Sequence, residues 1–231
     1  MKKIFLSTVT ASLLFLSMQS VAQISFGPKV GLNISRVSGD DEADITNAKS
    51  KVGFQAGGML NAQINDYFAI RPELLFNNVG SIFKETDLKM TLNTNYLSLP
   101  INFVGQYPIS DKFKLQGFVG PYAALGLGGK RKLEITDPSD PYNETINIKM
   151  KKVPSEINDN VMYLNGWDLG LNFGLGFQYT AFVFTANYSL GLSSLEPHYK
   201  NTDEESNRGG DGKLYNRNIT FGLAYLFGGK K

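Results

Sequence analysis

Residues 166–179 alternate large apolar side chains with small or polar ones along their whole length. One face carries Trp167, Leu169, Leu171, Phe173, Leu175, Phe177 and Tyr179, and the other carries glycines with Asp168, Asn172 and Gln178. A repeat of two residues is that of a β-strand. This segment is longer than the five or six residues of an ordinary strand. The pattern therefore predicts a long strand whose two faces meet different surroundings.

The same alternation recurs in seven further segments. Together they predict eight strands, at about 24–35, 52–64, 68–79, 95–107, 113–128, 166–179, 182–192 and 216–227. Three connections are turns of two or three residues, at Asn65, Ser110 and Thr180. They alternate with four longer polar connections, at about 38–51, 80–94, 129–165 and 194–215. An up-and-down meander with an even number of strands places all the long loops on one side.

Alternation alone does not distinguish a soluble barrel with an apolar core from a membrane barrel with an apolar exterior. The polar face is rich in Gly, Ser, Asn and Gln, whereas a soluble surface carries many Lys and Glu. Aromatic residues gather near strand ends, as at membrane interfaces. Most strands also reach the length that crosses a bilayer when tilted. We therefore expect an all-β fold, an eight-stranded antiparallel up-and-down transmembrane β-barrel with its bulky apolar face on lipid.

The N-terminus has the pattern of a secretory signal peptide. Two lysines precede an apolar run from Ile4 to Leu16, and Ser20-Val21-Ala22 fits a cleavage site. We expect a signal peptide at 1–22 and a barrel domain at 23–231. The chain has no cysteine, so the sequence predicts neither disulfides nor a lipoprotein anchor.

Composition excludes one class of partner. Removing Lys2 and Lys3 from the 23 basic residues leaves 21, which equals the number of acidic residues. A neutral mature chain gives no electrostatic reason to expect binding to nucleic acid. No motif for a cofactor is present, and we predict none.

Four charged residues lie on the polar face of the predicted strands: Lys29, Arg71, Glu73 and Asp168. A charge inside a packed barrel is costly without a partner. We expect an ion-pair network containing Arg71 and Glu73 that fills and stabilises the interior. An eight-stranded barrel is normally filled by its own side chains. The alternative is a narrow polar conduit or a small-ligand-binding barrel.

Three segments carry a family resemblance: Asn95-Tyr-Leu-Ser-Leu-Pro-Ile-Asn-Phe103, Gly117-Phe-Val-Gly-Pro-Tyr122 and Asp168-Leu-Gly-Leu-Asn-Phe-Gly-Leu-Gly-Phe177. They resemble the PorT-like outer-membrane β-barrel family of Bacteroidetes. The resemblance implies a location in the cell outer membrane, contact with lipid and lipopolysaccharide, and a link to type IX secretion. Tyr225-Leu226-Phe227 resembles the C-terminal signal read by the barrel-assembly machinery, which implies that this machinery is a partner during insertion.

Catalysis and metal binding have weaker support. His198 lies near Ser193, Ser194 and Glu196, so a rim-site lipid-modifying enzyme remains the least favoured alternative. Serine and acidic residues are common in exposed loops, and we predict a non-catalytic protein. Acidic residues cluster at 40–44 and 203–211 but match no fixed calcium loop, and we predict no metal site.

The connection at 129–165 is the candidate interaction site. Basic residues at 130–132 and 149–152 could contact lipid phosphates or an anionic partner. Ile135, Ile146 and Ile148 predict that the flanking strands, 113–128 and 166–179, extend beyond the membrane as a hairpin. A protruding strand edge can recruit another chain by strand addition. We expect an envelope protein partner through 131–163, and a purely structural barrel is the competing hypothesis.

Overall fold

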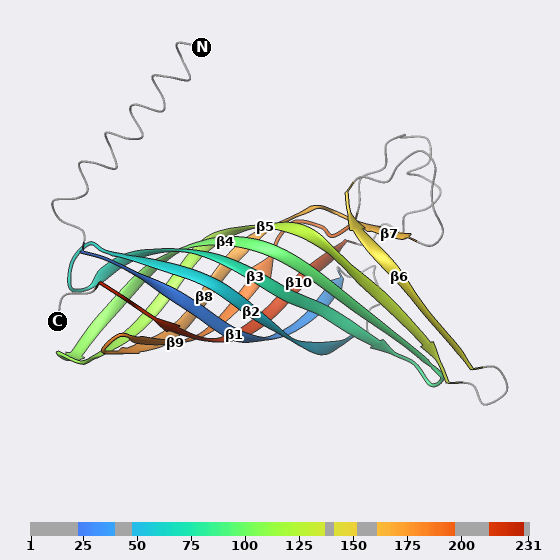
Figure 1. The fold of residues 1–231 in the computed structure, drawn as a ribbon, viewed down its shortest axis with the longest axis horizontal. Helices are drawn as coiled ribbons and strands as arrows, with labels where there is room; N and C mark the ends of the chain where they lie inside the picture. The colour runs from blue at the N-terminus through green and yellow to red at the C-terminus, as the bar shows by residue number, and fades with distance from the viewer. Residues whose placement is uncertain (1–22, 40–47, 137–140, 152–160, 197–212, 229–231) are drawn as a thin grey trace, which may run out of the picture.

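The structure is a computed structural model that describes residues 23–39, 48–136, 141–151, 161–196 and 213–228. The predicted signal peptide at 1–22 lies outside this part of the chain. The described regular structure is ten strands in one sheet (Figure 1): β1 (Gln23–Gly39), β2 (Ala48–Gln63), β3 (Phe68–Lys84), β4 (Leu88–Ser110), β5 (Phe113–Ile135), β6 (Tyr142–Met150), β7 (Val161–Leu164), β8 (Trp167–Tyr179), β9 (Phe182–Gly191) and β10 (Leu214–Tyr225). In this part of the chain no helix is long and apolar enough to cross a membrane.

Eight of the strands pair in a closed ring. Each is antiparallel to the next in the order β1, β2, β3, β4, β5, β8, β9 and β10, and β10 returns to β1. The closing pair runs from Lys29 opposite Ala224 to Gly39 opposite Leu214. A closed ring pairs the backbone groups of every wall strand, as a membrane requires.

The other two strands lie outside the ring. β6 is antiparallel to β5, and β7 is parallel to β6. β5 leaves β8 beyond Leu125, but β4 and β5 stay paired as far as Leu88 opposite Ile135. The ends of β3, β4 and β5 therefore continue past the ring together with β6 and β7 (Figure 1). We call residues 48–50, 80–84, 88–95, 129–135, 142–150 and 161–164 the projecting sheet.

The three predicted tight turns are confirmed at the opposite end of the ring. Asn65 Oδ1 accepts hydrogen bonds from the backbone N–H groups of Tyr67 and Phe68, each at 2.9 Å. β4 ends at Ser110 and β5 begins at Phe113. Thr180 has a φ of 53°, a left-handed conformation suited to the turn between β8 and β9. Asn and Thr side chains that bond to nearby backbone stabilise such turns.

The predicted face orientation is also confirmed. Leu171, Phe173 and Phe184 are 40%, 45% and 38% exposed on the outer wall, whereas Asn172 between them is 8% exposed. The bulky apolar face therefore points out of the ring, and the glycine and asparagine face points into it.

Two predictions about the long connections are wrong. The segment 80–94 is not a loop, because β3 and β4 continue to Lys84 and Leu88 and only Glu85–Asp87 joins them. The segment 129–165 contains the end of β5, β6 and β7, so the hairpin partner of β5 is a separate strand and not an extension of β8. Both errors have one cause. In the projecting sheet the apolar residues change from the outer to the inner face, and this hides the continuation of the strands.

Candidate functional site

The ring interior is filled by matching small residues to large ones. A Cβ added at Gly170 would lie 2.6 Å from Cε1 of Tyr122, and one added at Gly174 would lie 2.7 Å from Cζ of Phe118. Real Cβ atoms do not approach so closely, so these glycines provide the space that the two aromatic rings occupy. The alternation along β8 therefore places large apolar side chains on the outer wall and leaves room inside the ring for aromatic rings from β5.

Lys29 and Glu73 form a buried ion pair inside the ring. Lys29 Nζ lies 2.8 Å from Glu73 Oε2, and the two side chains are 4% and 3% exposed. Transfer of both charges from water is costly, and their mutual attraction offsets that cost only when the geometry is good. The pair joins β1 to β3 across the interior.

Arg71, expected in a network with Glu73, bonds instead to neutral amides. It is 1% exposed, and it donates to Asn61 Oδ1 at 3.1 Å and to Gln116 Oε1 at 3.0 Å. Gln116 in turn donates to Gln106 Oε1 at 3.3 Å and to Gln178 Oε1 at 3.2 Å. Glu73 takes Lys29 as its ion-pair partner, so Arg71 belongs to a separate amide network nearer the short turns.

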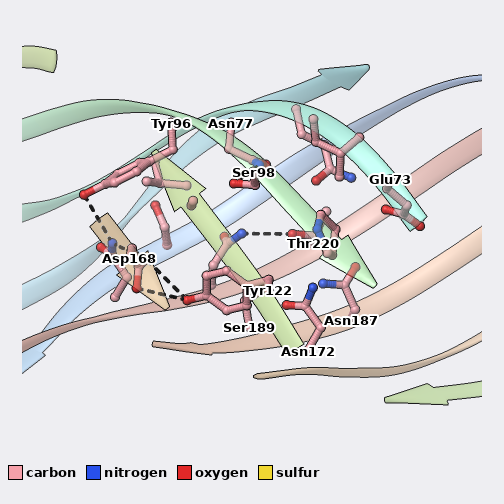
Figure 2. A pocket seen from close by; sticks show the side chains of 18 of the residues that line it. Glu73, Asn77, Tyr96, Ser98, Tyr122, Asp168, Asn172, Asn187, Ser189 and Thr220 are labelled. Carbon is pink, nitrogen blue, oxygen red and sulfur yellow. Dashed lines mark hydrogen bonds between the residues drawn. The ribbon is translucent and has the colours of Figure 1, made fainter. Parts of the chain in front are cut away.

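Asp168 lies at the other end of the interior with neutral partners (Figure 2). Its carboxylate accepts hydrogen bonds from Asn216 Nδ2 at 2.9 Å, from the Tyr122 hydroxyl at 3.3 Å and from Ser193 Oγ at 3.4 Å. Tyr122 is on an interior-facing position of β5 and is 8% exposed, and its ring fills the space left by Gly170. Sequence reasoning missed Tyr122 and Asn216 because nothing local to them signals a distant carboxylate.

A small polar cavity separates Asp168 from the Lys29–Glu73 pair (Figure 2). Its volume is about 60 Å³. Asn172 Oδ1, Asn218 Oδ1 and Gln55 Nε2 are buried around it without a hydrogen-bond partner in the described part of the protein. The cavity can hold a few water molecules, which would satisfy such atoms. It is far smaller than the roughly 300 Å³ at which small-molecule pockets begin.

The outer wall of the ring is an apolar band. Aromatic side chains that are 38–66% exposed surround it near the short turns: Phe26, Phe68, Tyr107, Tyr179, Phe182, Tyr225 and Phe227. Trp167, 54% exposed, marks its other end. Among the described wall positions between these two levels, no Asp, Glu, Lys or Arg points outward. Such a band with an aromatic girdle is typical of a barrel in lipid.

The projecting sheet has the opposite polarity. On its inner face Leu92, Ile148 and Leu164 are buried at 3–6% exposure. Four further side chains pack against them: Phe83, Met90, Met150 and Met162. Its outer face carries the exposed or half-buried lysines Lys49, Lys84, Lys89, Lys130, Lys132 and Lys149. Lys89 and Lys132 both bond to Glu134, at 2.8 Å and 2.7 Å, and these bonds lower the pKa of Glu134 to about 2.

The residues of the alternative sites lie outside the part of the chain that the structure describes: His198 and the acidic segments 40–44 and 203–211. Ser193 Oγ, 3.4 Å from Asp168, accepts the backbone N–H of Leu169 at 2.8 Å. Within the described ranges, no group of three or more His, Cys, Asp or Glu side chains could hold a metal ion.

The comparison with protein families agrees with this architecture. A family described as outer membrane protein beta-barrel domain matches residues 18–196. Among solved structures, the chain is similar to Ail, the attachment invasion locus protein of Yersinia pestis, with 17% identity over 88% of this chain and 98% of that chain and a TM-score of 0.41. It is also similar to Neisserial surface protein A, with 11% identity over 87% and 97% of the two chains and a TM-score of 0.40. No curated protein matches the chain.

The family match covers most of the chain, including seven of the eight ring strands. The chain therefore belongs to the outer membrane protein β-barrel domain family, and the protein is located in the outer membrane.

Proposed function

We propose that this protein is a non-catalytic, eight-stranded, up-and-down transmembrane barrel that holds an interaction sheet at the cell surface for another envelope protein. The observation that carries the proposal is the continuation of β4 and β5. Each has 23 residues, whereas a tilted strand of about 9–11 residues crosses a bilayer. A barrel that served only to occupy the membrane would not need the extra length. The long-loop end faces the outside of the cell, as in barrels of this type.

A structural role for the interior supports an anchoring function. Lys29, Arg71, Glu73 and Asp168 are each less than 5% exposed, and their partners come from strands on different sides of the ring. These contacts join the wall across the centre, and the remaining cavity is small. A conduit or a small-ligand barrel is the second candidate, and zero conductance of the purified protein in planar bilayers would exclude the conduit.

The free edge of β7 is the proposed docking site. β7 pairs with β6 along one edge, and no strand pairs with its other edge within the part of the chain that the structure describes. An unpaired edge presents backbone N–H and C=O groups to an added strand. The buried cluster around Leu92 and Ile148 holds β6 and β7 against β4 and β5, so the edge has a defined position.

The experiment is photo-crosslinking in intact cells. A photoreactive residue at Val161 on β7 is compared with one at Val119, which is 53% exposed on the outer wall. The proposal predicts a discrete protein adduct from position 161 and none from position 119. A deletion of 131–163 that keeps heat-modifiable migration should lose the same partner on affinity capture. Absence of any adduct along β7 would favour a purely structural barrel.

Two finer assignments are part of the proposal. The strand motifs at Asn95–Phe103, Gly117–Tyr122 and Asp168–Phe177 support PorT-like membership and, through it, a link to type IX secretion. Phe227 bonds to Phe26 through the backbone at 3.1 Å and 2.7 Å, a position suited to a closing-strand signal for the assembly machinery.

Loss of surface display of secreted proteins in a deletion strain would test the secretion link. An unchanged lipid A profile with His198→Ala would support the non-catalytic assignment.

A further inference from the structure

The outer face of the projecting sheet is continuous with the lipid-facing wall. Along β4 the outward positions run from Phe103 to Leu97 in the wall and then through Asn95 and Asn93 to Lys89. Directly opposed residues of an antiparallel pair share a face. Lys130 opposes Asn93, and Lys132 opposes Thr91, so these lysines stand on the same side of the sheet as the wall leucines.

An asparagine layer marks the upper limit of the apolar band. Asn78 Nδ2 donates to Asn93 Oδ1 and to Asn95 Oδ1, each at 2.7 Å, and Asn78 Oδ1 accepts from Lys51 Nζ at 2.9 Å. This bonded layer follows Leu97 directly. At about 3.3 Å per residue, Lys130 opposite Asn93 lies roughly 13 Å along the strand from Leu97. A strand tilted by 35–45° rises about 10 Å over that length, and the long side chain of a lysine there can reach back to the headgroup layer.

Charge on this outer face is almost all of one sign. Its strands carry six lysines, the set named above, and Glu134 is the one acidic residue among their described outward positions. Glu134 bonds to Lys89 and Lys132. Lys130 and Lys149 form no ion pair with any described residue. Within the described residues, these two positive charges are therefore available to an external anion at the lowest level of the sheet.

We infer that the outer face of the projecting sheet, centred on Lys130 and Lys149, binds phosphate-bearing headgroups of the outer-leaflet lipid. The assignment rests on the transmembrane orientation proposed above. Continuity with the lipid-facing wall brings the lysines to the headgroups, and their charge complements phosphate. Bound lipid holds the sheet against the membrane surface and leaves the β7 edge free for a protein.

The test uses the full-length mature chain in phosphatidylcholine nanodiscs with increasing fractions of diphosphorylated lipid A. Native mass spectrometry measures the fraction of protein that carries lipid A. The double variant Lys130→Gln, Lys149→Gln is compared with Lys112→Gln, Lys114→Gln, which removes the same charge at the short-turn end. At about 1 kcal/mol for each lysine, the first variant should raise the half-saturating lipid A fraction at least ten-fold. The control should match wild type.

Three outcomes would overturn the inference. The first is wild-type binding by the Lys130/Lys149 variant, and the second is an equal loss in the short-turn control. The third is equal retention of lipid A whose phosphates have been removed. Stronger capture of a soluble polyanion through the same lysines in detergent would reassign the face to a surface polymer. Failure of wild type to insert, seen as loss of heat-modifiable migration, would instead refute the transmembrane proposal on which the inference rests.

Discussion

The lower and upper halves of β4 are one continuous strand with opposite polarity. In the ring, Leu97, Leu99 and Ile101 point outward and polar residues point inward. In the projecting sheet, Leu92 and Met90 point inward, and the outer face is polar and basic. The backbone is the same, so the difference reflects the solvent on each side. In the proposed orientation, lipid surrounds the lower half, and water and headgroups surround the upper half.

The largest expected effect concerns the interior of the ring. Glu73→Gln leaves the Lys29 charge buried without its partner, which costs about 3–5 kcal/mol. The unfolding free energy in urea, measured in phospholipid vesicles by heat-modifiable migration, should fall by that amount. Lys89→Gln, which breaks an exposed pair of the projecting sheet, is the control and should leave the ring unchanged. Equal effects would contradict the distinction between the two regions.

Next in size is a charge on the outer wall. Leu99→Arg places a guanidinium in the middle of the apolar band and should destabilise the folded barrel by about 2–4 kcal/mol. Asn143→Arg, on the outer face of the projecting sheet and opposite Glu134 in the β5–β6 pair, should change stability by less than about 0.5 kcal/mol. The same unfolding experiment measures both. A tolerated arginine at position 99 would mean that this wall does not contact lipid.

A smaller and local effect is expected in the projecting sheet. Leu92→Ala removes buried apolar contacts with Ile148 and Leu164, at a cost of about 2 kcal/mol to the attachment of β6 and β7. Amide hydrogen exchange should accelerate at Ile146 and Ile148 while the amides of β8 and β9 keep their protection. Acceleration throughout the ring would show that the two regions unfold as one unit.

The smallest effect is a pH dependence confined to the projecting sheet. The bonds from Lys132 and Lys89 lower the pKa of Glu134 to about 2 in the folded protein. The pair therefore stabilises the sheet fully above the unfolded pKa of about 4.3 and loses this contribution as the pH falls toward 2. Intrinsic-rate-corrected protection of β5 and β6 amides should decrease between these values. Glu134→Gln should remove that decrease, and its persistence in the variant would assign it to another group.

The sequence predicted the ring well because each wall strand has one face on lipid. A strict period of two then identifies the strand, its outward face and, from Asn65 and Thr180, the tight turns. The projecting sheet was not predicted, and the reason is physical. Its strands exchange apolar and polar faces at Asn95, so a search for one continuous apolar face ends there.

The candidate site was predictable only in its charged members. Lys29, Arg71, Glu73 and Asp168 stand out as charges among neutral residues. Their partners do not, because Asn61 and Asn216 look like any other interior amide. Which side chain each charged residue pairs with depends on the register stagger between strands that are distant in sequence. The alternation pattern contains no information about that stagger.

The central claim is that the bulky face of the ring lies in hydrocarbon and the lysine face of the projecting sheet lies at the headgroups. Because the chain has no cysteine, a single introduced cysteine can carry a fluorophore at Leu171, Asn172 or Lys149. Quenching by lipids brominated on the acyl chains should be strong at position 171 and weak at 172, and a headgroup quencher should act at 149. Strong acyl-chain quenching at 172 together with protection at 171 would contradict the account.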